Sequence, residues 1–418
     1  MVAVERQCAS GVDMSERIDL IIAGGGAAGL SLALAVHVAS DGALTVAVCD
    51  PALSASHRGD SRAYALVAGA RRFLDSLGAW QGMAAAAEPI TGMDITDSGL
   101  NEPVRPLILN FGGERPDGEP FAHMVPNGAI LAALTRRAQE VGIRLVGRPV
   151  EAVERSPRRV RVRADACQFD APLLVAADGK ASALRQQAGI PFYGWDYGQT
   201  AIVGTISHSL PHQGRAVEHF LPAGPFAMLP LPGNACSLVW TERTVDARRF
   251  LAMPQEDLID QIDRRAAGRF GVITAVRDIG GFPLSLGIAR SFVAERLALL
   301  GDAAHVMHPI AGQGLNYGLR GAAALAETIV DSARVGLDIG SPVALEPYER
   351  SRRSDVVRMA LATDALNRLF SNDAGPLRLL RDVGLGLVER APRQKDWFIA
   401  EAAGETAAAP RAFRGLAI

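Results

Sequence analysis

The chain has 418 residues, of which 49% are apolar, and its 43 basic and 45 acidic residues leave a net charge of −2. This composition can bury a sizeable core, and the length predicts two interleaved domains rather than one. No basic excess indicates nucleic-acid binding, and no run of 18 or more uninterrupted apolar residues indicates a membrane-spanning helix.

The four cysteines and the amino terminus carry little functional signal. Neither a CxxC pair nor a metal-ligand spacing occurs, so we expect reduced thiols, no bound metal and a cytoplasmic protein. Residues 1–16 are polar and without periodicity, which predicts a loose leader. Residues 20–39 are apolar, but three glycines interrupt them where a signal peptide needs a continuous apolar region. The cysteines are Cys8, Cys49, Cys167 and Cys236.

The first predicted unit is a strand, a glycine-rich turn, a helix and a second strand. Residues 17–23 form a short apolar run, which is typical of a buried parallel strand. The Ala- and Leu-rich residues 27–40 predict a helix, and residues 44–49 predict the next strand. Together they predict a βαβ unit that ends at Asp50.

Beyond this unit, helices and strands flank a β-rich segment. Between residues 200 and 292 the apolar runs are short and separated by Gly and Pro, which predicts a mostly antiparallel sheet able to cover a ligand. A polar helix at 255–269 interrupts the segment, which separates two parts of a discontinuous nucleotide-binding domain. The other predicted elements are helices 69–78, 129–141, 314–335, 342–370 and 376–390 and strands 160–163, 173–176 and 297–300.

The first chemical motif is a GxGxxG sequence that opens the first helix. Its glycines allow a tight turn and close approach to a pyrophosphate, whose charge is stabilised at a helix amino terminus. Asp50 follows Gly29 by 21 residues, where a carboxylate can accept hydrogen bonds from both ribose hydroxyls. The alternative is a turn without a ligand, and the motif does not distinguish FAD from NAD. The candidate residues are Gly24, Gly26, Ala27, Ala28, Gly29 and Asp50.

The second motif, DGKASALR, covers residues 178–185 and follows the strand at 173–176. An Asp-Gly pair after a strand is also an ordinary turn. Ser182 predicts a helix N-cap, and Arg185 adds a basic residue one turn later, so the two residues can hold this loop near a phosphate.

The third motif, GDAAHVMHPIAGQGLNYGLRG, covers residues 301–321. A predicted strand places Asp302 at its tip, where the carboxylate can bond a sugar-like hydroxyl chain. The backbone N–H groups of residues 312–316 open the following helix and can face a developing negative charge. The alternative is a plain loop between strand and helix, which this density of Gly, Pro and polar residues disfavours.

In this order and spacing, GxGxxG, DGxxSxxR and GDAAHxxxPxxGxGxN resemble the class A flavoprotein aromatic hydroxylases, the p-hydroxybenzoate hydroxylase group, over most of the chain. Within that group the chain is similar to the hydroxylases of ubiquinone biosynthesis. Residues 60–66, 218–232, 236–240 and 366–372 carry this narrower resemblance. It departs at Gly321, where relatives often have an acidic residue, and at 126–128, where they often carry Arg.

The resemblance implies an α/β fold with a discontinuous, Rossmann-like FAD-binding domain, an inserted, mostly antiparallel β-sheet substrate domain and C-terminal helices. The expected boundaries are a disordered leader at 1–16, the first part of the FAD-binding domain with some substrate-domain elements at 17–195, the β-rich substrate domain at 196–292, the second part of the FAD-binding domain at 293–370 and a helical region at 371–418.

The resemblance also implies roles for the motif residues. Gly24, Gly26, Ala27, Ala28, Gly29 and Asp50 would form the ADP site, Arg62 would lie on the FAD, Asp178 would lie near the pyrophosphate and the NAD(P)H path, Gly301 and Asp302 would hold the ribitol or adjoining phosphate, and Pro309, Gly312, Gly314, Leu315 and Asn316 would lie beside the isoalloxazine.

The activity implied is that of an FAD-dependent monooxygenase acting on a prenylated phenol. NAD(P)H would reduce FAD, O₂ would form a C4a-hydroperoxyflavin, and the electron-rich ring would take up one oxygen atom. No nucleophilic side chain or metal is needed. His305 and His308 are interpreted as loop histidines rather than as catalytic acids or bases.

Three other roles share some of these features. An FAD-dependent halogenase would need a WxWxIP segment, whereas FYGWDYG surrounds Trp195. An FAD-dependent prenyl reductase and a flavin-binding assembly component of a quinone-synthesis complex, without turnover, remain alternatives. Residues 376–399 combine apolar side chains at helical spacing with Arg, Lys, Trp and Phe, so this segment either packs on the protein or rests peripherally on the inner membrane. Other ubiquinone-biosynthesis proteins are possible partners.

Overall fold

The computed structural model describes residues 15–54, 60, 62–98, 107–112, 118–371 and 409–418. The first layer is a six-stranded sheet in the order β19-β20-β13-β2-β3-β9, parallel except where β19 joins it. Its strands are β2 (Leu20–Ala23), β3 (Val46–Cys49), β9 (Arg144–Val146), β13 (Leu173–Ala176), β19 (Val293–Ala294) and β20 (Leu297–Leu299). The second part of the predicted nucleotide-binding unit thus pairs directly with the first, as β20 lies beside β13.

Helix burial explains why the first helix is apolar on every side. α1 (Ala27–Ala39) packs against both α3 (Asn127–Glu140) and α7 (Gly314–Arg334), and most of its residues are buried. A helix covered on several faces has no need for a polar face. Strand β2 is likewise fully buried, which accounts for its uninterrupted LIIA sequence.

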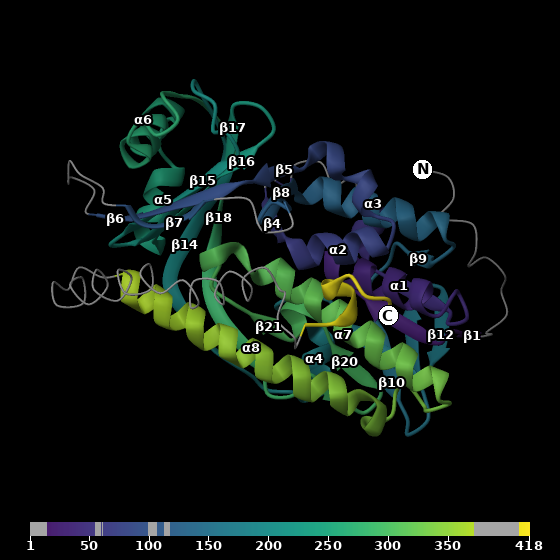
Figure 1. Cartoon of the computed structure of the whole chain (residues 1–418). Coiled ribbons are helices and arrows are strands. Elements are labelled where there is room, and N and C mark those ends of the chain that lie inside the picture. The colour runs from purple at the N-terminus through teal and green to yellow at the C-terminus, as the bar shows by residue number, and fades with distance from the viewer. Residues whose placement is uncertain (1–14, 55–59, 61, 99–106, 113–117, 372–408) are drawn as a thin grey trace.

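A second, eight-stranded sheet has the order β21-β18-β14-β17-β16-β15-β6-β7 (Figure 1). Its strands are β6 (Gly92–Asp97), β7 (Leu107–Gly112), β14 (Phe192–His208), β15 (Arg215–Leu221), β16 (Gly224–Leu231), β17 (Ala235–Arg243), β18 (Ile273–Ala289) and β21 (His305–Val306). α5 (Thr244–Leu251) and α6 (Gln255–Ala266) cover one face, where Phe226 and Trp240 lie in the core.

The remaining elements join the two layers. A three-stranded sheet of order β4-β8-β5 packs beside β16, and α8 contacts elements of both large sheets, along which it runs in Figure 1. The elements not yet named are β1 (Glu16–Arg17), β4 (Ala63–Val67), β5 (Glu88–Ile90), β8 (Ala122–Pro126), β10 (Ala152–Arg155), β11 (Val160–Ala164), β12 (Cys167–Ala171), α2 (Ala68–Ser76), α4 (Ala183–Gln187), α8 (Pro342–Phe370) and the 3-10 helices Pro51–Ser54, Trp80–Gly82, Ala84–Ala86, Gly301–Ala303, Ile310–Gly312 and Arg411–Arg414. This mixture of a Rossmann-like layer and an antiparallel-rich sheet confirms the predicted fold class.

The chain ends were predicted to be a loose leader and a helical region. Most of the predicted leader and the helix expected at 376–390 lie outside the described residues, and the domain boundaries stay a prediction. Residues 409–418 return to the first layer, where the Phe413 ring lies 5.7 Å from that of Phe73 on α2. Phe413 is fully buried, so this last segment is part of the main core.

The cysteines depart from expectation at one position. Cys49 and Cys236 are free, as predicted, and both are buried. Cys167, at the start of β12, is disulfide-bonded, so the prediction of four reduced thiols is wrong there. Spacing along the chain does not show which distant cysteine lies nearby in space. In the part of the chain that the structure describes, no helix is long and apolar enough to cross a bilayer.

Candidate functional site

Two adjoining cavities follow the carboxyl ends of β2, β3 and β13. The first has a volume of about 540 Å³ and the second about 390 Å³, and both are lined by Gly26, Ala177 and Gly179. Ligands of open parallel sheets bind at the carboxyl ends of the strands. Twelve of the predicted cofactor residues line one or both cavities: Gly24, Gly26, Ala27, Ala28, Gly29, Asp50, Arg62, Asp178, Gly301, Asp302, Gly314 and Leu315.

The glycine-rich turn has a different steric demand at each of its first two motif positions. Gly24 has a φ of +122°, and a Cβ there would overlap the carbonyl oxygen of Ala177. Gly26 is exposed, and a Cβ there would meet no protein atom within 4 Å, so its missing side chain leaves a cradle that faces the first cavity. Gly26 is also the N-cap of α1, with no side chain bound to the cap. The backbone N–H groups of this turn therefore suit a phosphate.

Asp50 closes the other side of this turn. Its carboxylate accepts hydrogen bonds from the backbone N–H of Gly25 at 2.6 Å and of Ala52 at 2.7 Å. These bonds orient the carboxylate at the carboxyl end of β3, beside the first cavity. The lone pairs that remain can accept from sugar hydroxyls.

The DGKASALR loop is tied to the third motif by Arg185. Ser182 is the N-cap of α4 and accepts a hydrogen bond from the Arg185 N–H at 3.0 Å, as predicted. The buried Arg185 guanidinium donates to the carbonyl oxygen of Ala303 at 2.9 Å and to that of Lys180 at 2.9 Å. Arg185 therefore holds the two loops together rather than reaching into the cavities, and Asp178 lines the first cavity beside it.

Opposite charges meet in the second cavity. Arg62 and Asp302 both line it, and the Arg62 guanidinium donates to Asp60 at 2.7 and 2.9 Å. This pairing, with a bond from Asn127, lowers the pKa of Asp60 to about 2. Asp302 keeps contact with solvent, but partial desolvation by the groove walls raises the pKa of its carboxyl, an effect that Arg62 and Lys180 oppose. Arg62 also lies over the Phe282 ring, 5.7 Å from its centroid.

The rest of the third motif divides into cavity lining and support. Gly301, Gly314 and Leu315 line the second cavity. The buried side chain of Asn316 donates to the carbonyl oxygen of Ala65 at 2.8 Å and accepts from the N–H of Val67 at 3.2 Å. Asn316 therefore fastens α7 to β4. Pro309 and Gly312 bound the 3-10 turn that precedes α7.

The two loop histidines are buried and neutral. Burial, with Arg352 nearby, lowers the pKa of His305 to about 3, and burial lowers that of His308 to about 4. His308 Nδ1 accepts from the Ile310 N–H at 3.2 Å, which assigns the ring proton to Nε2. Neither ring is a ready proton donor at neutral pH, and their interpretation as loop histidines stays a prediction.

Several residues in or beside the cavities were not singled out from the sequence. Lys180 donates to the Ser285 hydroxyl at 2.6 Å and so connects the second motif to β18. Tyr64, Asn127 and Met307 line the second cavity. Asn127 lies in the 126–128 segment where the family pattern departs. Its hydrogen bond to Asp60 depends on proximity in space, which the sequence does not show.

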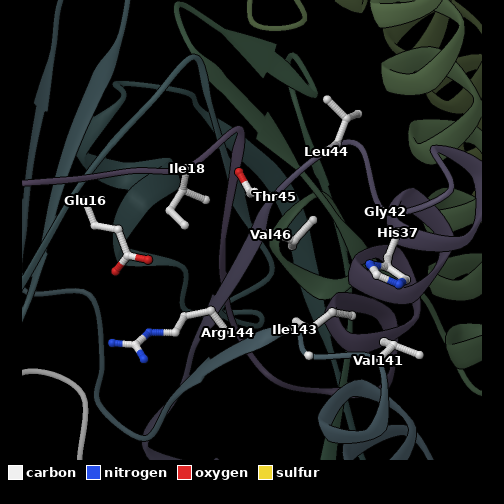
Figure 2. Close-up of a pocket in the computed structure, with 11 residues that line it drawn as sticks. Glu16, Ile18, His37, Gly42, Leu44, Thr45, Val46, Val141, Ile143 and Arg144 are labelled. Atoms are coloured by element: carbon white, nitrogen blue, oxygen red, sulfur yellow. The ribbon is translucent and has the colours of Figure 1, made fainter.

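A separate depression lies at the opposite end of the first sheet (Figure 2). Glu16, His37, Thr45 and Arg144 line it, near the amino ends of β3 and β9 and the carboxyl end of α1. None of the predicted cofactor residues belongs to it. Its position away from the carboxyl ends of the strands separates it from the nucleotide groove.

Comparison with known proteins identifies the family of the chain. Residues 17–362 match the FAD binding domain family. The chain is 40% identical over 404 residues to the ubiquinone hydroxylase UbiL of Rhodospirillum rubrum, covering 95% of this chain and 93% of the relative. It is 30% identical to the mitochondrial ubiquinone biosynthesis monooxygenase COQ6 of Danio rerio, covering 94% and 90%.

A solved structure agrees at the level of the fold. The p-nitrophenol 4-monooxygenase PnpA of Pseudomonas putida superposes with a TM-score of 0.75 at 17% identity, covering 93% of this chain and 98% of that one. The open cradle at Gly26, the carboxylate at Asp50 and the elongated groove fit a dinucleotide. The chain therefore belongs to the class A flavoprotein aromatic hydroxylases and carries their FAD-binding domain.

Proposed function

We propose that this chain is an FAD-dependent monooxygenase that hydroxylates the aromatic ring of a polyprenylated phenol in ubiquinone biosynthesis, with NAD(P)H and O₂ as cosubstrates. The observation that carries the proposal is the 40% identity to a ubiquinone hydroxylase over nearly the full length of both chains. The resemblance covers the β-rich sheet as well as the FAD-binding layer, so it extends to the part expected to hold the substrate.

The groove residues suit the binding of FAD. The turn at Gly24–Gly26 and the amino end of α1 would hold the pyrophosphate, and Asp50 would accept bonds from the ADP ribose. Asp302 and Arg62 would hold the ribitol and the adjoining phosphate. Bound FAD supplies the redox chemistry, by taking a hydride from NAD(P)H and activating O₂.

The eight-stranded sheet supplies an apolar wall for the aromatic substrate. Ala201, Val203 and Leu284 form a small buried cluster on it, with Tyr197, Val239 and Phe282 packed against them. Because Arg62 lies over Phe282, this wall adjoins the second cavity. An apolar wall excludes water and gains roughly 0.8 kcal/mol for each CH₂ of a prenyl chain that it buries.

The test is turnover by the purified protein loaded with FAD. NADH or NADPH oxidation should rise on addition of a short-chain prenylphenol, and mass spectrometry under ¹⁸O₂ should show one labelled oxygen on the ring. Addition of hydrogen to a prenyl double bond would instead identify a reductase. Bound FAD that never turns over, with other quinone-synthesis proteins co-purifying, would identify an assembly component.

We also propose that the protein works at the cytoplasmic surface of the inner membrane, where a polyprenyl substrate resides, together with other ubiquinone-biosynthesis proteins. The basic and aromatic residues of 376–399 support this, since such a composition favours anionic lipid surfaces.

A further inference from the structure

Glu218 stands out among the buried side chains of the eight-stranded sheet. It lies on β15 and is 9% exposed. Among the described residues no side chain or backbone group bonds its carboxyl, whereas Asp94 and Glu242, two other buried carboxylates of the sheet, bond arginines. Burial alone raises the pKa of Glu218 to about 7. Carboxyl groups are rarely buried without a partner unless a ligand supplies one.

Strand register shows which way Glu218 points. Its neighbours Val217 and Leu221 pack with the core under α5 and α6, so Glu218 belongs to the opposite face. Directly paired residues share a face. The pairing across the sheet places Ile95, Glu218, Ala227, Val239 and Val203 in one row on that face.

The same row belongs to the wall proposed for the substrate. Val203 and Val239 lie in the apolar cluster that includes Phe282, and Phe282 lies under Arg62 of the flavin groove. On the other side, Ala216, two residues before Glu218, packs in a cluster with Ala65 of β4. A Cβ at Gly312 would lie 3.8 Å from that of Ala65, so this side reaches the loop expected beside the isoalloxazine.

Two further polar groups on this face also lack partners. The hydroxyl oxygens of Ser237 and Thr241 on β17 are buried without a hydrogen-bond partner within the described residues. Register puts both on the Glu218 face, because they alternate with Leu238 and Trp240 of the opposite core. The face is therefore apolar with a few unsatisfied polar groups, which is the composition of a site for an apolar ligand with one polar substituent.

Resting on the proposed function, we infer that Glu218 binds the ring hydroxyl of the phenolic substrate and accepts its hydrogen bond. The proton remains on the phenol oxygen, and no covalent bond forms or breaks at Glu218. Such a bond orients the ring on the wall and keeps electron density on its oxygen, which favours oxygen transfer to the ring.

The experiment compares a phenol with its methyl ether. Geranylphenol and geranyl methoxybenzene differ in one donor, and each is titrated at pH 8 against the FAD-loaded protein by the change in flavin absorbance. The wild type should bind the phenol about 10- to 100-fold more tightly than the ether, the range of a hydrogen bond to a charged acceptor. Glu218→Leu should lose this preference, and Glu218→Gln, which retains an acceptor oxygen, should keep part of it.

Glu256→Leu is the matched control, because it makes the same chemical change at an exposed position of α6, which covers the opposite face of the sheet. It should keep the wild-type preference, and FAD content and circular dichroism establish that each variant is folded. If Glu218→Leu folds and keeps the full preference, Glu218 is not the hydroxyl ligand. If Glu218→Leu does not fold, an unchanged preference in Glu218→Gln overturns the inference.

Failure of the inference is distinguishable from failure of the proposed function. A wild type that hydroxylates prenylphenols but shows no preference for the hydroxyl refutes the role of Glu218 alone. A wild type that neither binds nor hydroxylates them refutes both.

Discussion

The clearest prediction concerns two glycines of the same turn. Gly26→Ala adds a Cβ where no protein atom lies within 4 Å, so the apoprotein should fold normally. That Cβ would fill the cradle and hold a phosphate away from the amino end of α1, where an anion gains about 0.5–2 kcal/mol. The Kd for FAD should therefore rise by about 2- to 30-fold.

Gly24→Ala, unlike Gly26→Ala, should lower the stability of the apoprotein. Its φ of +122° is unfavourable for alanine by about 1–3 kcal/mol, and its Cβ overlaps the Ala177 carbonyl in addition. The apoprotein should therefore melt at a lower temperature than the wild type, before FAD is considered.

The assay is the same for both variants. Quenching of FAD fluorescence gives the Kd, and thermal melting of the apoprotein, followed by circular dichroism, gives the stability. If Gly26→Ala binds FAD as the wild type does, the cradle does not hold the phosphate. If the Gly24→Ala apoprotein melts at the same temperature as the wild type, the turn relaxes more easily than its geometry indicates.

Three further predictions follow from other contacts. The pKa of Asp60 is lowered, so the Arg62–Asp60 pair is intact above the ordinary carboxyl range and is lost only as pH falls toward about 2. FAD affinity measured from pH 8 to pH 5 should therefore show no loss that comes from this pair. A loss of affinity in that range that Asp60→Asn removes would contradict the prediction. Phe413→Ala should lower the free energy of unfolding by about 3–5 kcal/mol while leaving the Kd for FAD unchanged, since Phe413 packs on α2 rather than in the groove; an unchanged denaturation midpoint would refute this. Replacing Arg378, Arg381, Arg390 and Arg393 by Glu should weaken co-sedimentation with anionic vesicles but not with neutral ones, and equal sedimentation of both proteins would remove the membrane proposal.

Substitution tests membrane binding more cleanly than truncation does, because the last segment of the chain belongs to the core. Removing residues 376–418 would also remove Ala409, Ala412 and Phe413, which are buried in the main core. A truncated protein could then lose membrane binding by unfolding alone, and the substitutions avoid that outcome.

The elements that sequence predicted well are those with a local signal. The helix expected at 314–335 is α7, Gly314–Arg334, and the strand at 173–176 is β13, because glycines, apolar periodicity and continuous apolar runs are visible in a short window. α5, with eight residues, was missed because it is too short to show a repeating pattern.

The pairing of strands that lie far apart in the chain was harder to predict from the sequence. β6 and β7 extend the eight-stranded sheet from a segment that precedes it by about a hundred residues, and β6 joins through a parallel pairing with β15 that no local pattern announces. The same holds within the site. Motifs indicated Asp50, Arg62 and Asp302, whereas the direction of Glu218 depends on the register of several strands.

The pairing of β20 with β13 also has a consequence for how the protein is made. The two strands are neighbours in the sheet, yet the whole of β14 to β18 is translated between them. At synthesis rates of about 5–20 residues per second, β20 emerges from the ribosome roughly 6–24 s after β13. During that interval the partial sheet exposes the edge of β13, and Phe413 emerges later still. The nascent chain thus carries an unpaired strand edge for longer than a chain with local contacts would, and such an edge is a template for aggregation.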